Sequence, residues 1–425
     1  MKQQLFTWNT DGLLSDERQH NGSDRDYFES DYKRIVTSPA FRRLQDKTQV
    51  FPLERNDFVR TRLTHSIEVA AIANQLLDAI CKNKYIPQKG NDEELKKSFD
   101  EFVHAKDIIF AILESASALH DIGNPPFGHF GEDIIQQWFK RHFPQDKTKL
   151  AQDILAKLPQ QVDYSRFAKY LNDFYEFEGN AQALRIITQL DENVAGCGMN
   201  LTYATINTII KYTRSSTEMD KRESDKLINK KIGYFLSEKD VFNTVTSVTK
   251  VKQARHPLTF ILEAADDIAY ITADIEDAIK KELFKFSEFQ EKLIDCLVKL
   301  IIKPESSQSK SIPIYKKFIT KIKDSNDIEI FNDLRNFFIL GASFIFCKKY
   351  KEIMSGGYNS DLFDDYDGVY SGLYSFLKQF AVDNIFNSKD ILKLEIAGNE
   401  VLGFLLNKFI FAVLPYEDLD AGKIN

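Results

Sequence analysis

The chain has 425 residues, of which 43% are apolar and 28% are charged, and its formal net charge is −7. That balance excludes a disordered chain, and the acidic charge argues against a duplex-DNA binder, which usually carries a basic face. Phe is abundant at 34 residues, whereas Gly at 18 and Pro at 11 are scarce. Because helix interiors tolerate few Gly and Pro, the composition favours an all-α fold.

The first third of the chain carries mainly helical patterns. Residues 1–30 are polar and are predicted to form an extended arm, with helices beginning at Asp31. An apolar stripe predicts a helix over 66–81, and a second helix, rich in Ile and Ala, is expected over 107–119. The second helix must end before Pro125-Pro126, because paired prolines cannot continue a helix. Two further elements are expected: a short hairpin over 50–58 and a helix over 132–141.

The rest of the chain is predicted to be helical as well. The strongest signal covers 258–284, where Ile recurs along one broad face. The charged stretch 213–231 is predicted to be a mobile loop, and the Ser-rich stretch 304–313 a linker. The linker would separate a catalytic part, residues 1–303, from a helical C-terminal part, residues 314–425, unless the two pack as one globule. Further helices are expected over 286–302, 315–322, 327–346 and 400–413.

The cysteines and the apolar segments indicate the compartment. The four cysteines form no C-x-x-C pair, which argues against a disulfide scaffold or a thiolate zinc site and favours a reducing environment. No stretch has the length of a signal peptide's apolar core or of a bilayer span. We therefore expect a soluble, cytoplasmic protein with no membrane partner. The cysteines are Cys81, Cys197, Cys296 and Cys347.

Side chains suited to metal binding recur at three places. His120 and Asp121 end the helix predicted over 107–119, His65 begins an amphipathic helix, and an acid pair, Asp266-Asp267, lies inside an apolar helix. A lone His-Asp pair is usually a surface ion pair or a helix cap, but an acid in an apolar stripe is costly unless it is paired or bound to metal. One His, one His-Asp pair and one helical Asp would bind a divalent cation and leave positions open for water or substrate.

Five segments between residues 41 and 270 resemble the HD phosphohydrolases and, within them, the deoxyguanosinetriphosphate triphosphohydrolase (dGTPase) family. Five long segments in the family's order are far more specific than the His-Asp pair alone. The resemblance implies an all-α HD-domain helical bundle with additional C-terminal helices. It also implies hydrolysis of dGTP, and of other dNTPs, to deoxynucleoside and inorganic triphosphate. The segments are Phe41–Val50, Arg60–Val69, His120–His129, Phe177–Gln182 and Glu263–Tyr270.

The resemblance also assigns the metal site. Asp266 is preferred to Asp267 because the family's ligand takes the first position of the acid pair, which leaves Asp267 as a helix-surface acid or a neighbour of the ligands. The cation itself would be Mg²⁺, Mn²⁺, Co²⁺, Fe²⁺ or Zn²⁺. The implied ligands are His65, His120, Asp121 and Asp266.

The implied catalytic pair is His129 and Glu132, placed on a loop stiffened by two prolines. The imidazole would serve the leaving oxygen or the attacking water, and the carboxylate would orient it. The alternative for His129 is a structural residue in a turn. Phe130, which lies between these two residues, is bulkier than the small residue that the family leads us to expect there. The difference bears on the shape of the pocket.

Other residues would hold the substrate. Asp266, Tyr270 and Asp274 are spaced i, i+4 and i+8, which places them on one helix face. With Gln49, the resemblance assigns Tyr270 and Asp274 to a deoxyribose pocket, where the aromatic ring would exclude a 2′-hydroxyl; simple core packing is the alternative for Tyr270. Asn180 is expected near the site without an assigned role. The remaining predicted substrate contacts are Arg62, Asn124, Lys211, Tyr212 and Lys231, and the histidines expected at the surface or in caps are His20, His104, His142 and His256.

Two other functions stay open on the sequence. Another HD-type nucleotide phosphohydrolase or phosphodiesterase would share the four ligands but not Gln49, Tyr270 and Asp274. A nucleotide- or single-stranded nucleic-acid-binding protein with an inactive HD core is the second alternative, and the acidic charge argues against it. The family resemblance also implies a homo-oligomer, and it leaves room for a weak affinity for single-stranded nucleic acid.

Overall fold

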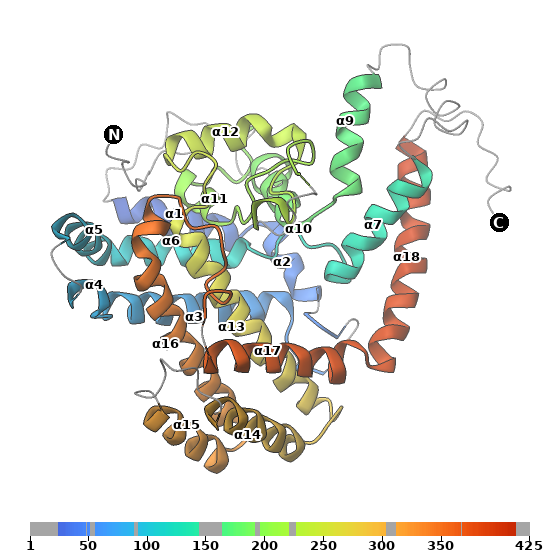
Figure 1. Ribbon diagram of the computed structural model, residues 1–425. Helices are drawn as coiled ribbons and strands as arrows, with labels where there is room; N and C mark the ends of the chain where they lie inside the picture. Colours follow the sequence, from blue (N-terminus) through green and yellow to red (C-terminus); the bar gives the residue numbers. More distant parts are fainter. Residues whose placement is uncertain are drawn as a thin grey trace.

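The computed structural model describes residues 24–47, 49–51, 56–88, 92–143, 164–191, 196–220, 227–302, 312–366 and 368–413. These residues contain no β-strand, so the protein is all-α, as predicted (Figure 1). The elements of the first half are α1 (Asp24–Val36), α2 (Pro39–Arg42), η1 (Arg43–Asp46), α3 (Arg62–Cys81), α4 (Tyr85–Gln88), α5 (Glu93–His104), α6 (Lys106–Leu119), α7 (Gly128–His142), α9 (Tyr164–Tyr175), α10 (Gly179–Arg185), η2 (Ile186–Leu190) and α11 (Tyr203–Thr208).

The second half contains the longest of the described helices, α13, α16 and α18. Its elements are η4 (Leu227–Asn229), η5 (Leu236–Glu238), α12 (Lys239–Val248), α13 (Pro257–Lys280), α14 (Phe286–Ile302), α15 (Ile312–Asp324), α16 (Asp327–Met354), α17 (Val369–Ala381), η6 (Val382–Phe386) and α18 (Lys389–Val413). The segments η2 and η6 are single turns of π-helix that continue α10 and α17.

The centre of the molecule is a group of four helices. Helix α3 packs against α6, α13 and α16, and α1 covers α6. Helix α13 is buried along nearly its whole length, including the Ile face that its sequence predicts. One continuous apolar core runs from Phe28 in α1 to Ile391 in α18. The C-terminal helices therefore share a core with the helices that precede them.

Local capping explains where the two central helices begin. Thr61 and Thr64 form a capping box at the start of α3, so the helix begins at Arg62, four residues before the predicted start. At α13, Pro257 takes the first turn and the side chain of His256 accepts a hydrogen bond from the backbone N–H of Leu258. His256 is thus a capping residue, as predicted, and burial lowers its pKa to about 3.

Helix α16 is long and apolar enough to cross a membrane by length and composition, but 72% of its most apolar window is buried inside the protein. It packs against α3 and α13, and rings of α14 and α15 contact its first half, where Phe289 stacks on Phe331 and Phe318 on Phe337 (Figure 1). Its apolar character is therefore that of a core helix. All four cysteines are free.

Several boundaries differ from the predictions. The prediction of an extended arm over residues 1–30 is wrong at its C-terminal end, because α1 begins at Asp24. This helix is anchored by the buried carboxylate of Asp31, which accepts hydrogen bonds from Thr202. Helix α7 begins at Gly128, so His129 lies in its first turn and not on a loop. Helix α18 begins eleven residues before the predicted start at 400.

The predicted loops can be compared only in part. Within the predicted hairpin, the described residues 50, 51 and 56–58 form bends and turns without a strand. The described part of 213–231 is non-helical except for η4. Residues 303–311 of the predicted linker, and His20, lie outside the described residues. The division into residues 1–303 and 314–425 therefore stays a prediction.

Candidate active site

Three helices bring their polar residues to one point. His65 lies in the first turns of α3, His120 directly follows α6, and Asp266 lies in the middle of α13. Their ligand atoms lie within 4.8 Å of one another. The Oδ1 atom of Asp266 is 3.0 Å from Nε2 of His65 and 3.5 Å from Nε2 of His120. Three of the four predicted ligands therefore converge on one place in the core.

The donor set fits a divalent cation. The Nδ1–H of His120 donates a hydrogen bond to the backbone carbonyl of Ser117 at 2.7 Å, so that Nε2 is the ring atom that faces Asp266. That Nε2 is buried and has no hydrogen-bond partner. Burial alone would lower the pKa of His120, but the carboxylates of Asp121 and Asp266 raise it to about 9. A cation between the imidazoles and the carboxylates would replace that proton.

Asp121 lies beside this group. Its Oδ2 is 3.6 Å from Nε2 of His120 and accepts a hydrogen bond from Nη1 of Arg62 at 2.6 Å, while its Oδ1 accepts one from the amide of Asn124. Burial alone would raise the pKa of Asp121, but the guanidinium of Arg62 and His120 lower it to about 2. The carboxylate is therefore ionised and held at the edge of the cluster.

A cavity of about 550 Å³ opens over the cluster, a volume in the range of nucleotide-sized ligands. Tyr270 and Asp274 line it one and two turns after Asp266, as their spacing predicts. The side-chain carbonyl of Gln49 and the Oδ2 atom of Asp274 are buried without a hydrogen-bond partner. Burial and the charge of Asp277 raise the pKa of Asp274 well above its usual range. Both groups are placed to bind a hydroxyl.

His129 and Glu132 form the second predicted group. The Nδ1–H of His129 donates to Oε2 of Glu132 at 2.8 Å, and the imidazole is 80% exposed at the mouth of the cavity. Glu132 is buried and its Oε1 accepts from the backbone N–H of Gly179. Burial alone would raise the pKa of Glu132, but the bond from His129 and the charge of Lys231 lower it. The carboxylate thus orients the ring and leaves Nε2 free for substrate.

Backbone conformation makes this arrangement possible. Phe127 and Gly128 both have positive φ, at 67° and 55°, where the chain turns into α7. A Cβ on Gly128 would lie 2.7 Å from the guanidinium of Arg62. Only glycine therefore lets the start of α7 approach the Arg62–Asp121 pair.

The predicted phosphate contacts are placed unequally. Lys211 lines the cavity and its Nζ lies 3.4 Å from Oδ2 of Asp266. Arg62, Asn124 and Asn180 line it as well. Among the described residues around the cavity, Tyr212 and Lys231 are absent: Tyr212 is buried, and Lys231 pairs with Glu178 and Glu132 behind His129. Their contact with phosphate stays a prediction.

The sequence reasoning missed two contributions to the site. The first is Lys47, whose Nζ donates to the backbone carbonyl of Asn124 at 2.7 Å, and whose pKa burial and Arg62 lower to about 8. The second is a wall formed by Lys378 of α17, Phe386 of η6, and Ile391 and Glu395 of α18. Lys47 belongs to one of the five segments and could have been noticed, whereas nothing around the other four signals a site.

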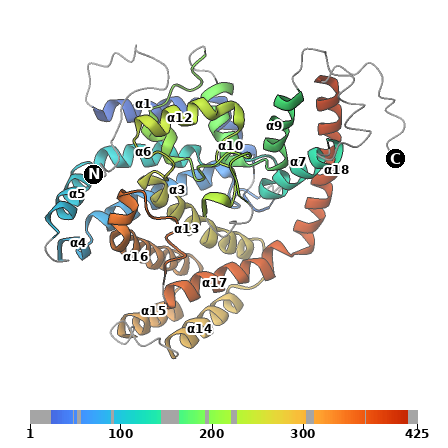
Figure 2. The ribbon, with the colours of Figure 1, turned by 45° about the horizontal axis from the view of Figure 1, so that its top comes forward.

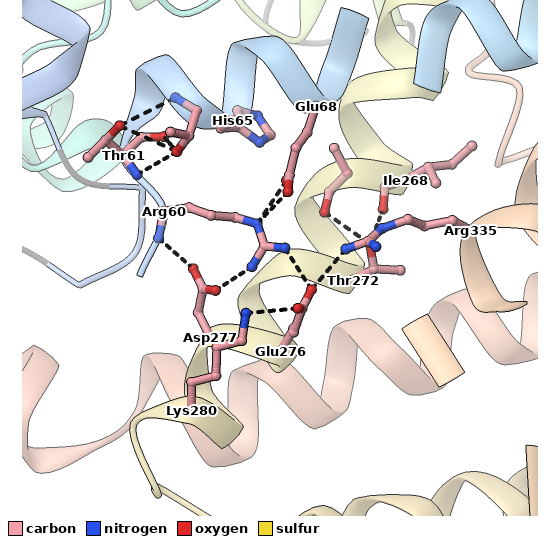
Figure 3. Close-up of polar contacts among 12 residues, drawn as sticks. Arg60, Thr61, His65, Glu68, Ile268, Thr272, Glu276, Asp277, Lys280 and Arg335 are labelled. Atoms are coloured by element: carbon pink, nitrogen blue, oxygen red, sulfur yellow. Dashed lines mark hydrogen bonds and ion pairs between the residues drawn. The ribbon is translucent and has the colours of Figure 1, made fainter. Parts of the chain in front are cut away.

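An ion-pair network behind the site joins α3 to α13 and α16 (Figure 3). Arg60 pairs with Glu68 at 2.8 Å, with Glu276 at 2.6 Å and with Asp277, and its backbone N–H also donates to Asp277. Arg335 of α16 adds a contact of 3.0 Å to Glu276. The Arg60 side chain is only 10% exposed, so these pairs are shielded from water. They hold the start of α3, with His65, against α13.

Two buried imidazoles and a carboxylate, gathered below a nucleotide-sized cavity in an all-α core, define an HD-type phosphohydrolase. A deoxyguanosinetriphosphate triphosphohydrolase-like protein of Listeria monocytogenes is 37% identical to this chain over 96% of the chain and 84% of its own length. A deoxyguanosinetriphosphate triphosphohydrolase of Enterobacter is 36% identical over 89% of the chain and 76% of its own length. No protein-family model matches the chain. The chain belongs to the deoxyguanosinetriphosphate triphosphohydrolase family.

Proposed function

We propose that this protein hydrolyses deoxynucleoside triphosphates, with dGTP among its substrates, to deoxynucleoside and inorganic triphosphate. The convergence of His65, His120 and Asp266 at the floor of a nucleotide-sized cavity carries the proposal. Relatives that bear the name of this activity match nearly the whole chain, which supports the same reaction. We place the enzyme in the cytoplasm, since its cysteines are free and α16, the one helix of the described residues with the length and composition of a membrane span, is mostly buried in the core.

The distribution of charge in the cavity supports metal dependence. Its ionised carboxylates are those of Asp121 and Asp266, beside Nε2 of His120, whereas burial raises the pKa of Asp267 to about 7 and that of Asp274 well above its usual range. The negative charge is thus concentrated at the predicted ligands, where it favours a bound cation. Held by His65, His120, Asp121 and Asp266, a divalent cation would supply Lewis acidity at the phosphorus; Mg²⁺, Mn²⁺, Co²⁺, Fe²⁺ and Zn²⁺ are all candidates.

The chain's own residues divide the remaining work. Arg62 and Lys211 lie beside the cluster and would hold the phosphate oxygens, with Lys231 and Tyr212 as outer contacts. His129, oriented by Glu132, would protonate the leaving 5′-oxygen or deprotonate the attacking water at Nε2. Cleavage of the P–O5′ bond then releases the triphosphate in one piece.

The sugar would lie against α13. The unpartnered oxygens of Gln49 and Asp274 would bind its 3′-hydroxyl, and the ring of Tyr270 would occupy the space of a 2′-hydroxyl. A buried acceptor left unpaired costs more than a missing contact at the surface, so these positions favour a substrate that satisfies both. The 2′-hydroxyl of a ribonucleotide would clash with the ring of Tyr270.

The decisive experiment is an assay of the purified protein against the four dNTPs and GTP, with each candidate cation in turn, reading products by ion chromatography. We expect inorganic triphosphate from dGTP and none from GTP. Orthophosphate or pyrophosphate would point to another HD-type phosphohydrolase, and no turnover with steeply salt-dependent DNA binding would point to a nucleic-acid-binding protein.

A further inference from the structure

Lys47 joins the two segments that hold Asp121. Its backbone carbonyl accepts a hydrogen bond of 2.8 Å from the backbone N–H of Arg62, at the start of α3. Its Nζ donates to the backbone carbonyl of Asn124 at 2.7 Å, on the turn that follows α6. Arg62 and Asn124 in turn donate side-chain hydrogen bonds to the two carboxylate oxygens of Asp121. One residue thus bonds both of the residues that bond this carboxylate.

The turn at Asn124 is packed tightly against α10. A Cβ on Gly123 would lie 2.0 Å from the carbonyl oxygen of Gly179, and a Cβ on Gly179 would lie 2.1 Å from Oδ1 of Asn124. The backbone N–H of Gly179 donates to Oε1 of Glu132 at 2.8 Å, and Glu132 orients His129. Both ribbon views show α10 between α6 and α7 (Figures 1 and 2). A displacement of the turn would therefore move Gly179, and with it the hydrogen bond to Glu132.

Lys47 acts from outside the cavity. The described residues that line the cavity include Arg62 and Asn124 but not Lys47. Burial and the like charges of Arg62 and Arg43 lower the pKa of Lys47 to about 8, although the charge of Asp121 opposes them. The ammonium is therefore held where its charge is disfavoured. Stability alone does not explain a cation at this position, whereas the hydrogen bond to Asn124 does.

We propose that Lys47 is a positioning residue that acts through the backbone carbonyl of Asn124. By holding this turn, it fixes Asp121 in the metal cluster and Glu132 against His129. Without its Nζ, the affinity for the cation and the orientation of the imidazole would change together. Groups behind a metal ligand tune metal affinity in this way. The inference rests on the metal site of the proposed function and adds a residue that touches neither metal nor substrate.

The first test measures the binding of Mn²⁺ to the metal-free full chain by isothermal titration calorimetry. Lys47→Met removes the donor and keeps a long side chain, and we expect it to weaken Mn²⁺ binding by about tenfold, the lower end of the range for groups behind a metal ligand. Lys317→Met, at an exposed residue of α15, is the matched control and should bind as the wild type does. Unchanged binding in K47M would overturn the inference and leave the proposed function standing, whereas a wild type that binds no Mn²⁺ would overturn both.

The second test determines whether Lys47 acts through Asn124. Asn124→Ala removes the amide that bonds Asp121, so Lys47→Met added to that variant should cause little further loss of Mn²⁺ affinity. Residues that act through one another give such non-additive effects, whereas independent residues give additive free energies. The full loss of each single variant, added together in the double variant, would exclude action through Asn124.

Hydrogen exchange followed by mass spectrometry, on the metal-free full chain, separates a local effect from a loss of stability. In K47M, backbone N–H groups of the turn at Asn124 and of the start of α10, including Gly179, should exchange faster than in the wild type, because the turn has lost its anchor. Exchange in α16 should stay unchanged. Faster exchange throughout the chain would mean that Lys47 only stabilises the fold, and unchanged exchange at Gly179 would remove its link to Glu132; either result overturns the inference.

Discussion

The two walls of the cavity differ in how they are built. On one side, the part-exposed Asp266 of α13 and the buried His120, which follows α6, line the cavity, and the buried His65 of α3 contacts Asp266, with an ion-pair network behind them. On the other side, α17, η6 and α18 supply Lys378, Phe386 and other ordinary side chains. The first wall requires particular side chains at fixed distances from one another, whereas the second requires only a complementary shape and a few charges. We therefore expect the first wall to carry the chemistry and the selection of the sugar, and the second wall to contribute to the selection of the base.

The largest effect is expected in the metal cluster. His120→Ala removes one imidazole ligand and should lower triphosphate release by about 10³-fold or more, because a Lewis acid supplies several kcal/mol and each 1.36 kcal/mol is a factor of ten. Metal content, measured by mass spectrometry, should fall in parallel. His104→Ala, at an exposed residue of α5, is the control and should keep full activity. Retained turnover in H120A would remove the cluster from the mechanism.

The network behind the first wall should control its stability. Arg60→Gln leaves Asp277 shielded from water without its cation and leaves Glu276 with Arg335 and Lys280 alone, and we expect a loss of about 3 kcal/mol in the free energy of unfolding. Urea unfolding followed by circular dichroism measures the loss. Arg335→Gln, at a more exposed side chain that bonds Glu276, Thr272 and the exposed Asn332, should cost less than half as much. Equal losses of unfolding free energy in the two variants would mean that Arg60 stabilises the wall no more than Arg335 does.

Glu132 offers a test of orientation as distinct from metal binding. Glu132→Gln keeps the shape but weakens the hold on His129, so kcat should fall by about 10²-fold while metal content stays at the wild-type level. Steady-state kinetics and metal analysis on the same sample separate the two. A variant that loses metal together with activity would contradict the assignment of the pair to proton transfer.

The smallest effect is expected on the second wall. Glu395→Gln removes a carboxylate that can accept hydrogen bonds from a nucleobase edge, and it should change the ratio of kcat/KM between dGTP and the other dNTPs by about tenfold, with little change in metal content. The same assay on Lys378→Met tests the neighbouring charge. An equal fall in kcat/KM for every dNTP would show that this wall contributes to catalysis. It would contradict the different roles assigned to the two walls.

Much of the site could be read from the sequence, because its chemistry depends on rare combinations of residues. His120 at the end of an apolar helix and Asp266 inside another suggest a metal site, and the family resemblance adds His65. The i, i+4, i+8 spacing places Tyr270 and Asp274 on the face of Asp266. Helical periodicity was equally informative, since the long helices and the absence of strands among the described residues follow from apolar spacing and few Gly and Pro.

Contacts between distant segments were decided only by the tertiary structure. The start of α1 depends on Asp31 meeting Thr202, and the start of α7 depends on two residues of positive φ that no local pattern marks. The second cavity wall is formed where α18 crosses to α7, a packing that propensity cannot specify. Local sequence determines which side chains can do chemistry, and packing across the chain determines what surrounds them.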